Sequence, residues 1–419
     1  MKVISSRSYG MRASPACLLV VSAMATAATA QAVLPDPTAL PVKDIFDVIR
    51  ELRHKPPTSP PTADQYKKLM ITAAPVIGYN PASGFGIGVA GNIAFFRGEP
   101  ATTRISSLVT SLKVTTKDQV SFNAKINAFT AGNRWNIVSD NRAYWTNQDT
   151  YGLGTSTTPD QAVNVKFDYL RFYETGYREL RPSLFAGVGF LYSGYRNIEP
   201  NPENAPGTPA PAYVADSNQN GFPLDSQISA GTSVNFLVDS RDNFINPSRG
   251  YYADLKYQMY FSGFLGGTST WQLSHADLRT YVRLNKDARQ RLAFWFFGNL
   301  VTGGAAPYFD LPSTGDDTYG RSGRGYTQGR FRGERMLYGE VEYRWTITKN
   351  GLIGMVAFLN TETLSNRQAN EKLFDSFATA GGVGLRLMMS KRSNTNLCVD
   401  YGRGEQGSDG VYFSIQEAF

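Results

Sequence analysis

The sequence predicts a membrane-spanning antiparallel β-barrel of about sixteen strands. Three observations lead to this all-β fold class. Apolar and polar residues alternate with a period of two along most of residues 69–419. Many of the alternating runs reach about nine to eleven residues, the length that crosses a bilayer, whereas strands of soluble proteins cluster near five or six. One face of each clear run is apolar, while the other mixes acids and bases that can pair across a lumen.

The chain opens with the features of a secretory signal peptide. Lys2, Arg7 and Arg12 form a basic region, residues 16–25 are apolar, and Ala-Thr-Ala at 28–30 matches a cleavage site. These first thirty residues are therefore excluded from the predicted fold. The remainder has no second apolar run long enough for a transmembrane helix.

Residues 31–68 are expected to form a periplasmic segment before the barrel, which is expected to span residues 69–419. Apolar residues within 45–52 recur at helical spacing and predict a short amphipathic helix. A proline-rich stretch at 55–61 then predicts a stiff linker. Two interpretations of the helix stay open: a tether with no binding role, or a helix that docks in or under the barrel mouth.

Sixteen runs can be assigned as strands, an even number as such barrels require. They are expected at 69–80, 85–97, 101–115, 119–131, 134–147, 162–175, 181–195, 228–240, 250–261, 272–285, 290–301, 334–347, 352–362, 377–389, 396–405 and 411–419. Short turns at 349–351 and 391–394 would face the periplasm. The long connections at 196–227 and 302–333 would face outward.

One of these long connections has an unusual composition. Residues 323–333 contain four glycines and three arginines, so the backbone can pack closely while guanidinium groups reach outward from it. We expect this loop to fold into the lumen and to be held there by Arg324. Asp316 and Asp317, earlier in the same connection, are expected to be solvated.

Four stretches carry a resemblance to a known family. They are the run D-S-R-D-N-F-I-N-P-S-R-G at 239–250, the Arg-Gly-Tyr at 324–326, the final run ending at Phe419, and the opening run 75–84. Together they resemble the bacterial surface antigen family, whose members are outer-membrane barrels of the BamA/TamA type. The resemblance covers essentially all of residues 69–419.

The first of these stretches also has a physical interpretation of its own. Pro247 presets one backbone angle and Gly250 supplies an unusual one, so the stretch predicts a tight periplasmic turn. Acidic and basic side chains around it, including Arg249, are expected to pair with one another. The turn motif comprises Asp239, Arg241, Asp242, Asn246, Pro247, Arg249 and Gly250.

The resemblance implies a partner for the loop arginine. In the family, that arginine reaches an aspartate on the inner wall of the next strand, within a pattern like F-x-D-x-G. The corresponding stretch here is 358–362, with Asn360 in place of the acid and Glu362 in place of the glycine. We therefore expect Arg324 to bond the carbonyl of Asn360, with Glu362 supplying the charge. The expected latch comprises Arg324, Gly325, Tyr326, Asn360 and Glu362.

A weak closing seam is the other expected feature. Pro75 lies in the first run, and proline cannot donate a hydrogen bond to a β-ladder. The first strand should meet the last, near residues 411–419, so Pro75 and Phe419 are expected to mark a seam that opens sideways. The alternative is that Pro75 simply precedes the strand.

The resemblance implies the outer membrane of a Gram-negative bacterium. Its lipids, and the barrel-assembly machinery that would insert this chain, are the implied partners. Residues 31–68 are too few for the POTRA domains that precede the barrel in longer members, so a short, barrel-only member is expected. The first expected function is outer-membrane biogenesis or transport of protein or lipid, and the alternative is a passive diffusion pore.

Nothing in the sequence predicts an enzyme or a cofactor. The chain has two histidines, His54 and His275, and neither lies near a nucleophile motif such as G-x-S-x-G. Cysteine and histidine do not cluster as zinc ligands. The G-x-G-x-x-G at 86–91 continues into a strand rather than a helix, so it does not predict a nucleotide site. A net charge of +7, with basic residues interleaved among acids, argues against nucleic-acid binding.

Overall fold

The structure is a computed structural model that describes residues 42–56, 68–80, 84–286 and 288–419. The predicted signal peptide and most of the proline-rich linker lie outside these ranges. No helix in the described ranges is both long enough and apolar enough to cross a membrane.

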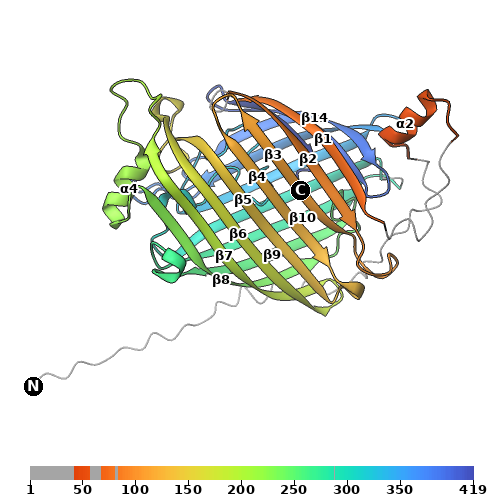
Figure 1. Cartoon of the computed structure of the whole chain (residues 1–419), viewed down its shortest axis with the longest axis horizontal. Coiled ribbons are helices and arrows are strands. Elements are labelled where there is room, and N and C mark those ends of the chain that lie inside the picture. The colour runs from red at the N-terminus through yellow and green to blue at the C-terminus, as the bar shows by residue number, and fades with distance from the viewer. Residues whose placement is uncertain (1–41, 57–67, 81–83, 287) are drawn as a thin grey trace, which may run out of the picture.

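Within the described residues, sixteen strands form one antiparallel sheet in which each strand pairs with its neighbours in sequence, as Figure 1 shows. The predicted fold class and strand number are confirmed. The strands are β1 (Met70–Asn80), β2 (Gly84–Phe95), β3 (Ser106–Thr115), β4 (Val120–Phe129), β5 (Trp135–Thr150), β6 (Val163–Arg181), β7 (Leu184–Pro200), β8 (Ser226–Asp239), β9 (Gly250–Tyr260), β10 (Trp271–Arg283), β11 (Gln290–Gly304), β12 (Arg335–Thr346), β13 (Ile353–Leu364), β14 (Ala378–Ser390), β15 (Thr395–Gly404) and β16 (Asp409–Ile415). Two α-helices, α2 (Ile45–Leu52) and α4 (Ala212–Asn220), and four 3-10 turns, η1 (Ala131–Asn133), η2 (Pro159–Gln161), η3 (Phe264–Gly266) and η4 (Tyr308–Asp310), complete the described elements.

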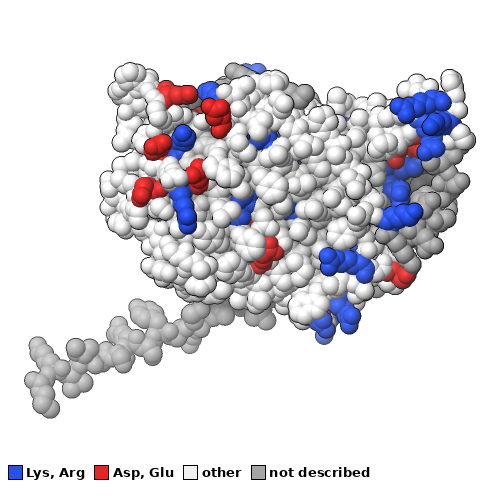
Figure 2. Space-filling view, in the orientation of Figure 1, with Lys and Arg blue, Asp and Glu red and all other residues white. Residues whose placement is uncertain are grey.

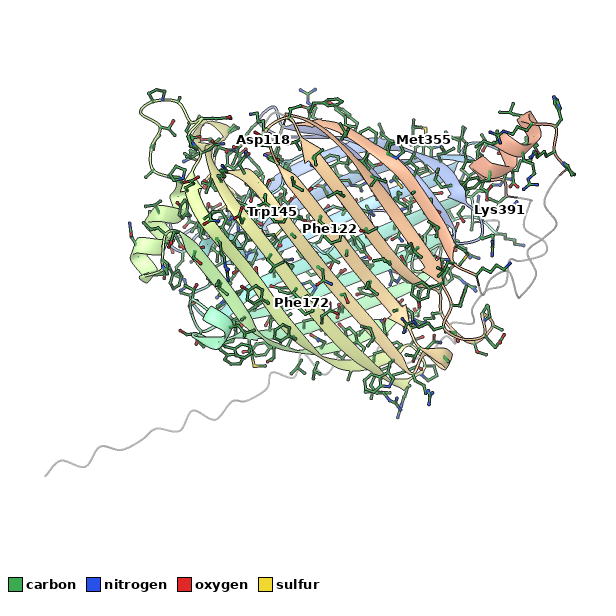
Figure 3. All side chains as sticks on the ribbon, in the orientation of Figure 1. Asp118, Phe122, Trp145, Phe172, Met355 and Lys391 are labelled. Atoms are coloured by element: carbon green, nitrogen blue, oxygen red, sulfur yellow. The ribbon has the colours of Figure 1, made fainter. Side chains whose placement is uncertain are left out.

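The wall is apolar outside and polar inside, the reverse of a water-soluble protein. Phe122, Trp145 and Phe172 are 42%, 54% and 45% exposed, and Figure 3 labels them on the outer wall. Lys125 lies three residues from Phe122 on β4, and Arg142 lies three residues from Trp145 on β5. An odd offset places them on the inner face, where both are buried. Figure 2 shows a wall that is largely free of charge, with Lys and Arg gathered toward the end that carries α2. The pattern suits a barrel whose outer surface contacts lipid.

The two ends of the barrel differ in their connections. The turns that follow even-numbered strands lie at the end that carries α2, and most are short, such as the two residues between β6 and β7. The connections that follow odd-numbered strands lie at the other end and include the two longest, 201–225 with α4 and 305–334. Both long connections thus lie at the end opposite the short turns 349–351 and 391–394, as expected.

The strand boundaries depart from expectation in a few places. β6 extends to Arg181 and β7 to Pro200, six and five residues past the expected ends, because they pair with each other along most of their length. β3 begins at Ser106 rather than residue 101, because the backbone N–H groups of Thr102 and Thr103 donate to the carbonyl of Glu99 in a turn.

The last strand is shorter than expected. β16 ends at Ile415, and Gln416 has a φ of 84°, which turns the chain out of the strand. The four residues 416–419 are all buried. The prediction that the final strand runs to Phe419 was therefore wrong, since the tail leaves the wall before its end.

Candidate functional site

The connection 305–334, here called the plug loop, crosses the lumen between opposite walls. On one side, Asp316 pairs with Arg171 of β6 at 3.1 Å, and Arg142 of β5 donates to the carbonyls of Asp317 and Thr318. The expectation that these two aspartates are solvated was wrong for Asp317, which is buried and accepts three backbone N–H groups of its own loop. On the other side, the loop is attached through Arg324.

Arg324 lies in a pocket of carboxylates. Its guanidinium is 2% exposed and donates to Asp400 Oδ2 at 2.6 Å, to Glu340 and to Glu342. The guanidinium also lies 3.9 Å from the ring centre of Phe358, where a cation is attracted to the ring face. Burial opposes the positive charge, but the three carboxylates outweigh it and raise the pKa of Arg324 well above its ordinary value. The side chain is therefore a fixed cation at the loop tip.

The predicted acceptors of Arg324 were wrong. Asn360 contacts the loop in the opposite sense, because its side-chain N–H donates to the backbone carbonyl of Arg324 at 3.0 Å. Glu362 accepts from Thr314 Oγ1 at 2.7 Å and does not pair with the arginine. In the β12–β13 register Glu340 lies directly opposite Asn360. The charge expected from residues 360 and 362 therefore comes from an acid on the neighbouring strand.

Two glycines allow the loop to approach the wall closely. Gly325 has a φ of 115°, and a Cβ built on it would lie 2.5 Å from Cβ of Ala380. A Cβ on Gly402 of β15 would lie 2.8 Å from the backbone nitrogen of Gly325. Any side chain at either position would push the loop tip off the wall.

Tyrosines join the loop tip to the last strands. Tyr326 donates through its hydroxyl to the carbonyl of Thr379 at 2.7 Å. The hydroxyl of Tyr412 on β16 accepts from the N–H of Gly325 and donates to the carbonyl of Tyr326, both at 2.9 Å. The loop and the last strand are thus held to each other directly.

The C-terminal tail lies beneath the plug loop in the lumen. Phe419 packs on Trp295, with ring centres 5.1 Å apart, and its carbonyl accepts from Arg344 at 3.0 Å. From the loop, Arg321 donates to the carbonyls of Ile415 and Gln416 at 3.1 Å each. Phe419 is therefore a lumenal residue, and the expectation that it marks the seam was wrong. The tail leaves the wall because its polar groups find partners inside.

The seam between the first and last strands lacks a backbone ladder among the described residues. β16 lies beside β1, and Pro75 lies within β1, paired in register with Val89 of β2 on its other side. Proline suits a strand edge that has no ladder partner.

Side chains inside the barrel bridge this seam at the end that carries α2. Asn92 donates to Thr395 Oγ1 at 3.1 Å and accepts from Ser107 at 2.7 Å, while Gln416 donates to Ser107 at 3.0 Å. These four residues, here called the clasp, connect β2 and β3 with the start of β15 and the tail. Two side-chain hydrogen bonds, Asn92 to Thr395 and Gln416 to Ser107, therefore cross the seam where a closed barrel has a ladder, and the Ser107–Asn92 bond links them.

The turn motif runs from the end of β8 at Asp239 to the start of β9 at Gly250, at the end that carries α2. Asp239 binds Arg241 through two bonds of 2.9 Å, and Asp242 pairs with Arg283 at 2.9 Å. Arg249 was expected to supply the positive charge of this turn. Among the described residues, it contacts Asp242 through its backbone N–H at 3.3 Å, and the cation paired with Asp242 is Arg283, so the expected pairing was wrong.

The rest of that motif is structural. Asn246 accepts from Arg291 at 2.7 Å, Pro247 lies in the turn, and Gly250 has a φ of 100° at the start of β9. At Gly250 a Cβ would lie 2.5 Å from the carbonyl of Ser240. The motif residues are thus spaced as they are because together they form one tight turn.

Aromatic side chains close the lumen at the end that carries α4. Tyr195 stacks on Phe309 of the plug loop with ring centres 5.2 Å apart, and Tyr213 of α4 packs against the same ring at 5.4 Å. Beside them, Asp310 accepts from Ser193 and Ser229 at 2.6 Å each. Burial raises the pKa of Asp310 to about 6, since burial disfavours the charged carboxylate.

Sequence reasoning missed several of the residues that hold the loop. They are Glu340, Glu342, Asp400, Gly402, Tyr412 and Arg321. A signal existed for part of this set, because Asp400, Gly402 and Gly404 alternate on one face of a single strand. His275 lies on the inner wall with Nδ1 2.8 Å from Asn299 Oδ1. The described residues contain no group of three or more potential ligands that could hold a metal.

Residues 85–419 match the Omp85 superfamily domain. The chain belongs to the Omp85 superfamily. The expected membership in this group of BamA-like barrels is thereby confirmed, and with it the location in the outer membrane of a Gram-negative bacterium.

Solved structures with the same fold include BamA from Haemophilus ducreyi lacking POTRA domains 1–3, and CdiB from Acinetobacter baumannii and from Escherichia coli. Their TM-scores are 0.51, 0.52 and 0.51 at sequence identities of 13%, 13% and 10%. The matches cover 83%, 83% and 86% of this chain but 69%, 59% and 63% of those chains. A comparison with curated proteins finds no match.

Proposed function

We propose that this Omp85 barrel acts in outer-membrane biogenesis or transport, moving or inserting protein or lipid at the seam between β1 and β16. The observation that carries the proposal is the missing backbone ladder between these strands in the described residues. An unpaired strand edge offers N–H and C=O groups to an incoming chain. Omp85 membership and the likeness to BamA and CdiB barrels support the same class of activity.

The plug loop and the tail inside the lumen argue against a diffusion pore. The plug loop is bonded to both walls, and the tail packs beneath it against Trp295. Arg321, Gly325 and Tyr326 connect the loop to the tail and to β16. We propose that the loop sets the position of the last strand, so that displacing it loosens the seam.

Single-channel recording in planar bilayers tests this proposal. The purified protein is compared with a variant in which residues 321–333 are replaced by a short Gly-Ser linker. We expect small, flickering conductance from the unmodified protein and larger, steadier conductance from the variant. Both proteins must show the folded, heat-modifiable band on gels before recording.

Large and steady channels from the unmodified protein would support the passive pore instead. Unchanged conductance after removal of residues 321–333 would also count against the proposal, because it would mean that the loop does not control the lumen.

A further inference from the structure

The helix α2 is attached to the barrel by its polar face. Asp47 pairs with Lys391 in the β14–β15 turn at 2.6 Å, and Asp44 accepts from the backbone N–H of Lys391 at 3.2 Å. The N–H of Lys43 donates to the carbonyl of Asn350 in the β12–β13 turn at 2.8 Å. Figure 3 shows Lys391 beside the helix at this end of the barrel.

The apolar face of the same helix points away from the protein. Phe46, Ile49 and Leu52 are 57%, 38% and 76% exposed, and their spacing places them on one side of the helix. A helix that docks in water buries its apolar face against the protein and leaves its acids in solvent. Here Asp44 and Asp47 bind the barrel rim, while Phe46, Ile49 and Leu52 are exposed. This arrangement suits contact between the apolar face and a non-aqueous phase.

The helix α2 lies near the edge of the apolar outer wall. Val42, just before the helix, lies over Gly351, where an added Cβ would come within 3.2 Å of it. Ile347 and Ile353, on either side of that turn, are exposed at the rim of the outer wall. The uncovered face of α2 thus stands near the last apolar residues of the barrel, where a bilayer surface would lie.

The charges around this face are mainly basic. Arg53 and Lys55 follow the helix and Lys349 lies in the neighbouring turn, all exposed. Figure 2 shows Lys and Arg collected at this end of the molecule. The acids of the helix are engaged, Asp44 and Asp47 by the rim and Glu51 by Lys43 at 2.5 Å. The accessible charge therefore complements anionic headgroups.

We infer that α2 is an interfacial lipid-binding helix, which inserts Phe46, Ile49 and Leu52 into the leaflet surface at the α2 end of the barrel and binds anionic phospholipid through the basic residues that follow it. An exposed apolar face flanked by Lys and Arg is the pattern of helices that lie in a membrane interface. Each basic residue near an anionic leaflet adds electrostatic attraction. The proposal is independent of whether the seam opens.

Depth-dependent fluorescence quenching tests this inference. Leu52→Cys and, as a matched control, Glu51→Cys on the polar side are labelled with an environment-sensitive dye in a chain that starts after the predicted signal peptide. That chain lacks Cys17, and Cys398 is buried. Each labelled barrel is placed in nanodiscs of phosphatidylcholine alone or mixed with phosphatidylglycerol. Lipids brominated near the glycerol end of the acyl chains serve as quenchers, and heat-modifiability confirms folding.

We expect the dye at position 52 to be quenched at least about threefold more than the dye at position 51, with stronger quenching in the anionic mixture. Arg53→Glu with Lys55→Glu should remove the gain that phosphatidylglycerol provides. Equal, water-like emission at both positions would overturn the inference. So would a blue-shifted dye at position 52 that brominated lipid does not quench, because a protein surface or a second copy would then cover the helix.

Discussion

Arg324 is the side chain on which the position of the plug loop chiefly depends. Its three carboxylate partners come from two strands, β12 and β15, so the arginine ties the loop to a wide part of the wall. Without Arg324, Glu342 and Asp400 would keep Arg344 and Arg386, but Glu340 would lose its cation. Breaking a buried ion pair by removing one partner costs about 3–5 kcal/mol. The cluster is therefore sensitive to small changes.

Arg324→Ala should release the loop, because Glu340, Glu342 and Asp400 would lose their shared cation. We expect faster trypsin cleavage within residues 321–332 and a lower temperature for conversion to the unfolded gel band. Arg335→Ala, an exposed arginine at the start of β12, is the matched control. Loop cleavage no faster than in the control would contradict the proposed anchor.

Glu362→Gln and Glu340→Gln test which acid holds the arginine. Glu362 bonds Thr314 rather than Arg324, so its substitution should leave loop cleavage within about twofold of the unmodified protein. Glu340→Gln should increase cleavage, because it removes a buried charge partner. The reverse order would support Glu362 as the charge partner of Arg324, as expected from the sequence.

Asp310 should make stability fall as the pH rises. Its folded pKa of about 6 lies above the ordinary value of 3.8, so its stabilising contribution is complete below about pH 4 and is lost as the pH passes 6. The difference is on the order of 3 kcal/mol. Asp310→Asn should remove this component, so melting temperatures measured at pH 5 and pH 8 should differ less in the variant. An identical pH dependence in both proteins would exclude Asp310 as the source.

At the scale of elements, the plug loop and β15 meet through backbone contact that only glycine permits. Gly402→Ala should displace the loop tip, since the added methyl would meet the nitrogen of Gly325. Gly339→Ala on β12 is the control, because a Cβ there meets nothing within 4 Å. We expect larger single-channel conductance from Gly402→Ala alone. Equal conductance from both variants would mean that the close approach does not hold the loop.

At the scale of the whole molecule, the seam should be the least stable part of the wall. In hydrogen exchange, the amides of β1 and β16 should exchange faster than those of β8 and β9, which are laddered on both sides. Ser107→Ala should accelerate exchange in β16 further, because it removes the centre of the clasp. Asn123→Ala, another lumenal polar substitution on β4, serves as the control. Protection of β16 equal to that of β9 would show a closed seam.

The sequence by itself determined the strands of the barrel wall and which of their side chains face the lumen. Alternation along each run is a local property, and burial of polar residues in a lumen and exposure of apolar ones to lipid follow from it directly. Most strand boundaries therefore agree with expectation, and so does the inward course of the loop that carries Arg324.

Only the tertiary structure decided what the loop and the tail bind. Glu340, Glu342, Glu362 and Asp400 all point inward, so they look alike in a period-two pattern, and their distances from Arg324 depend on which strands the loop reaches across the lumen. The tail at 416–419 likewise continues an alternating run, yet the lumenal partners of Glu417 and Phe419 draw it from the wall. Both outcomes depend on long-range charge pairing and packing, whose distances the local sequence pattern does not contain.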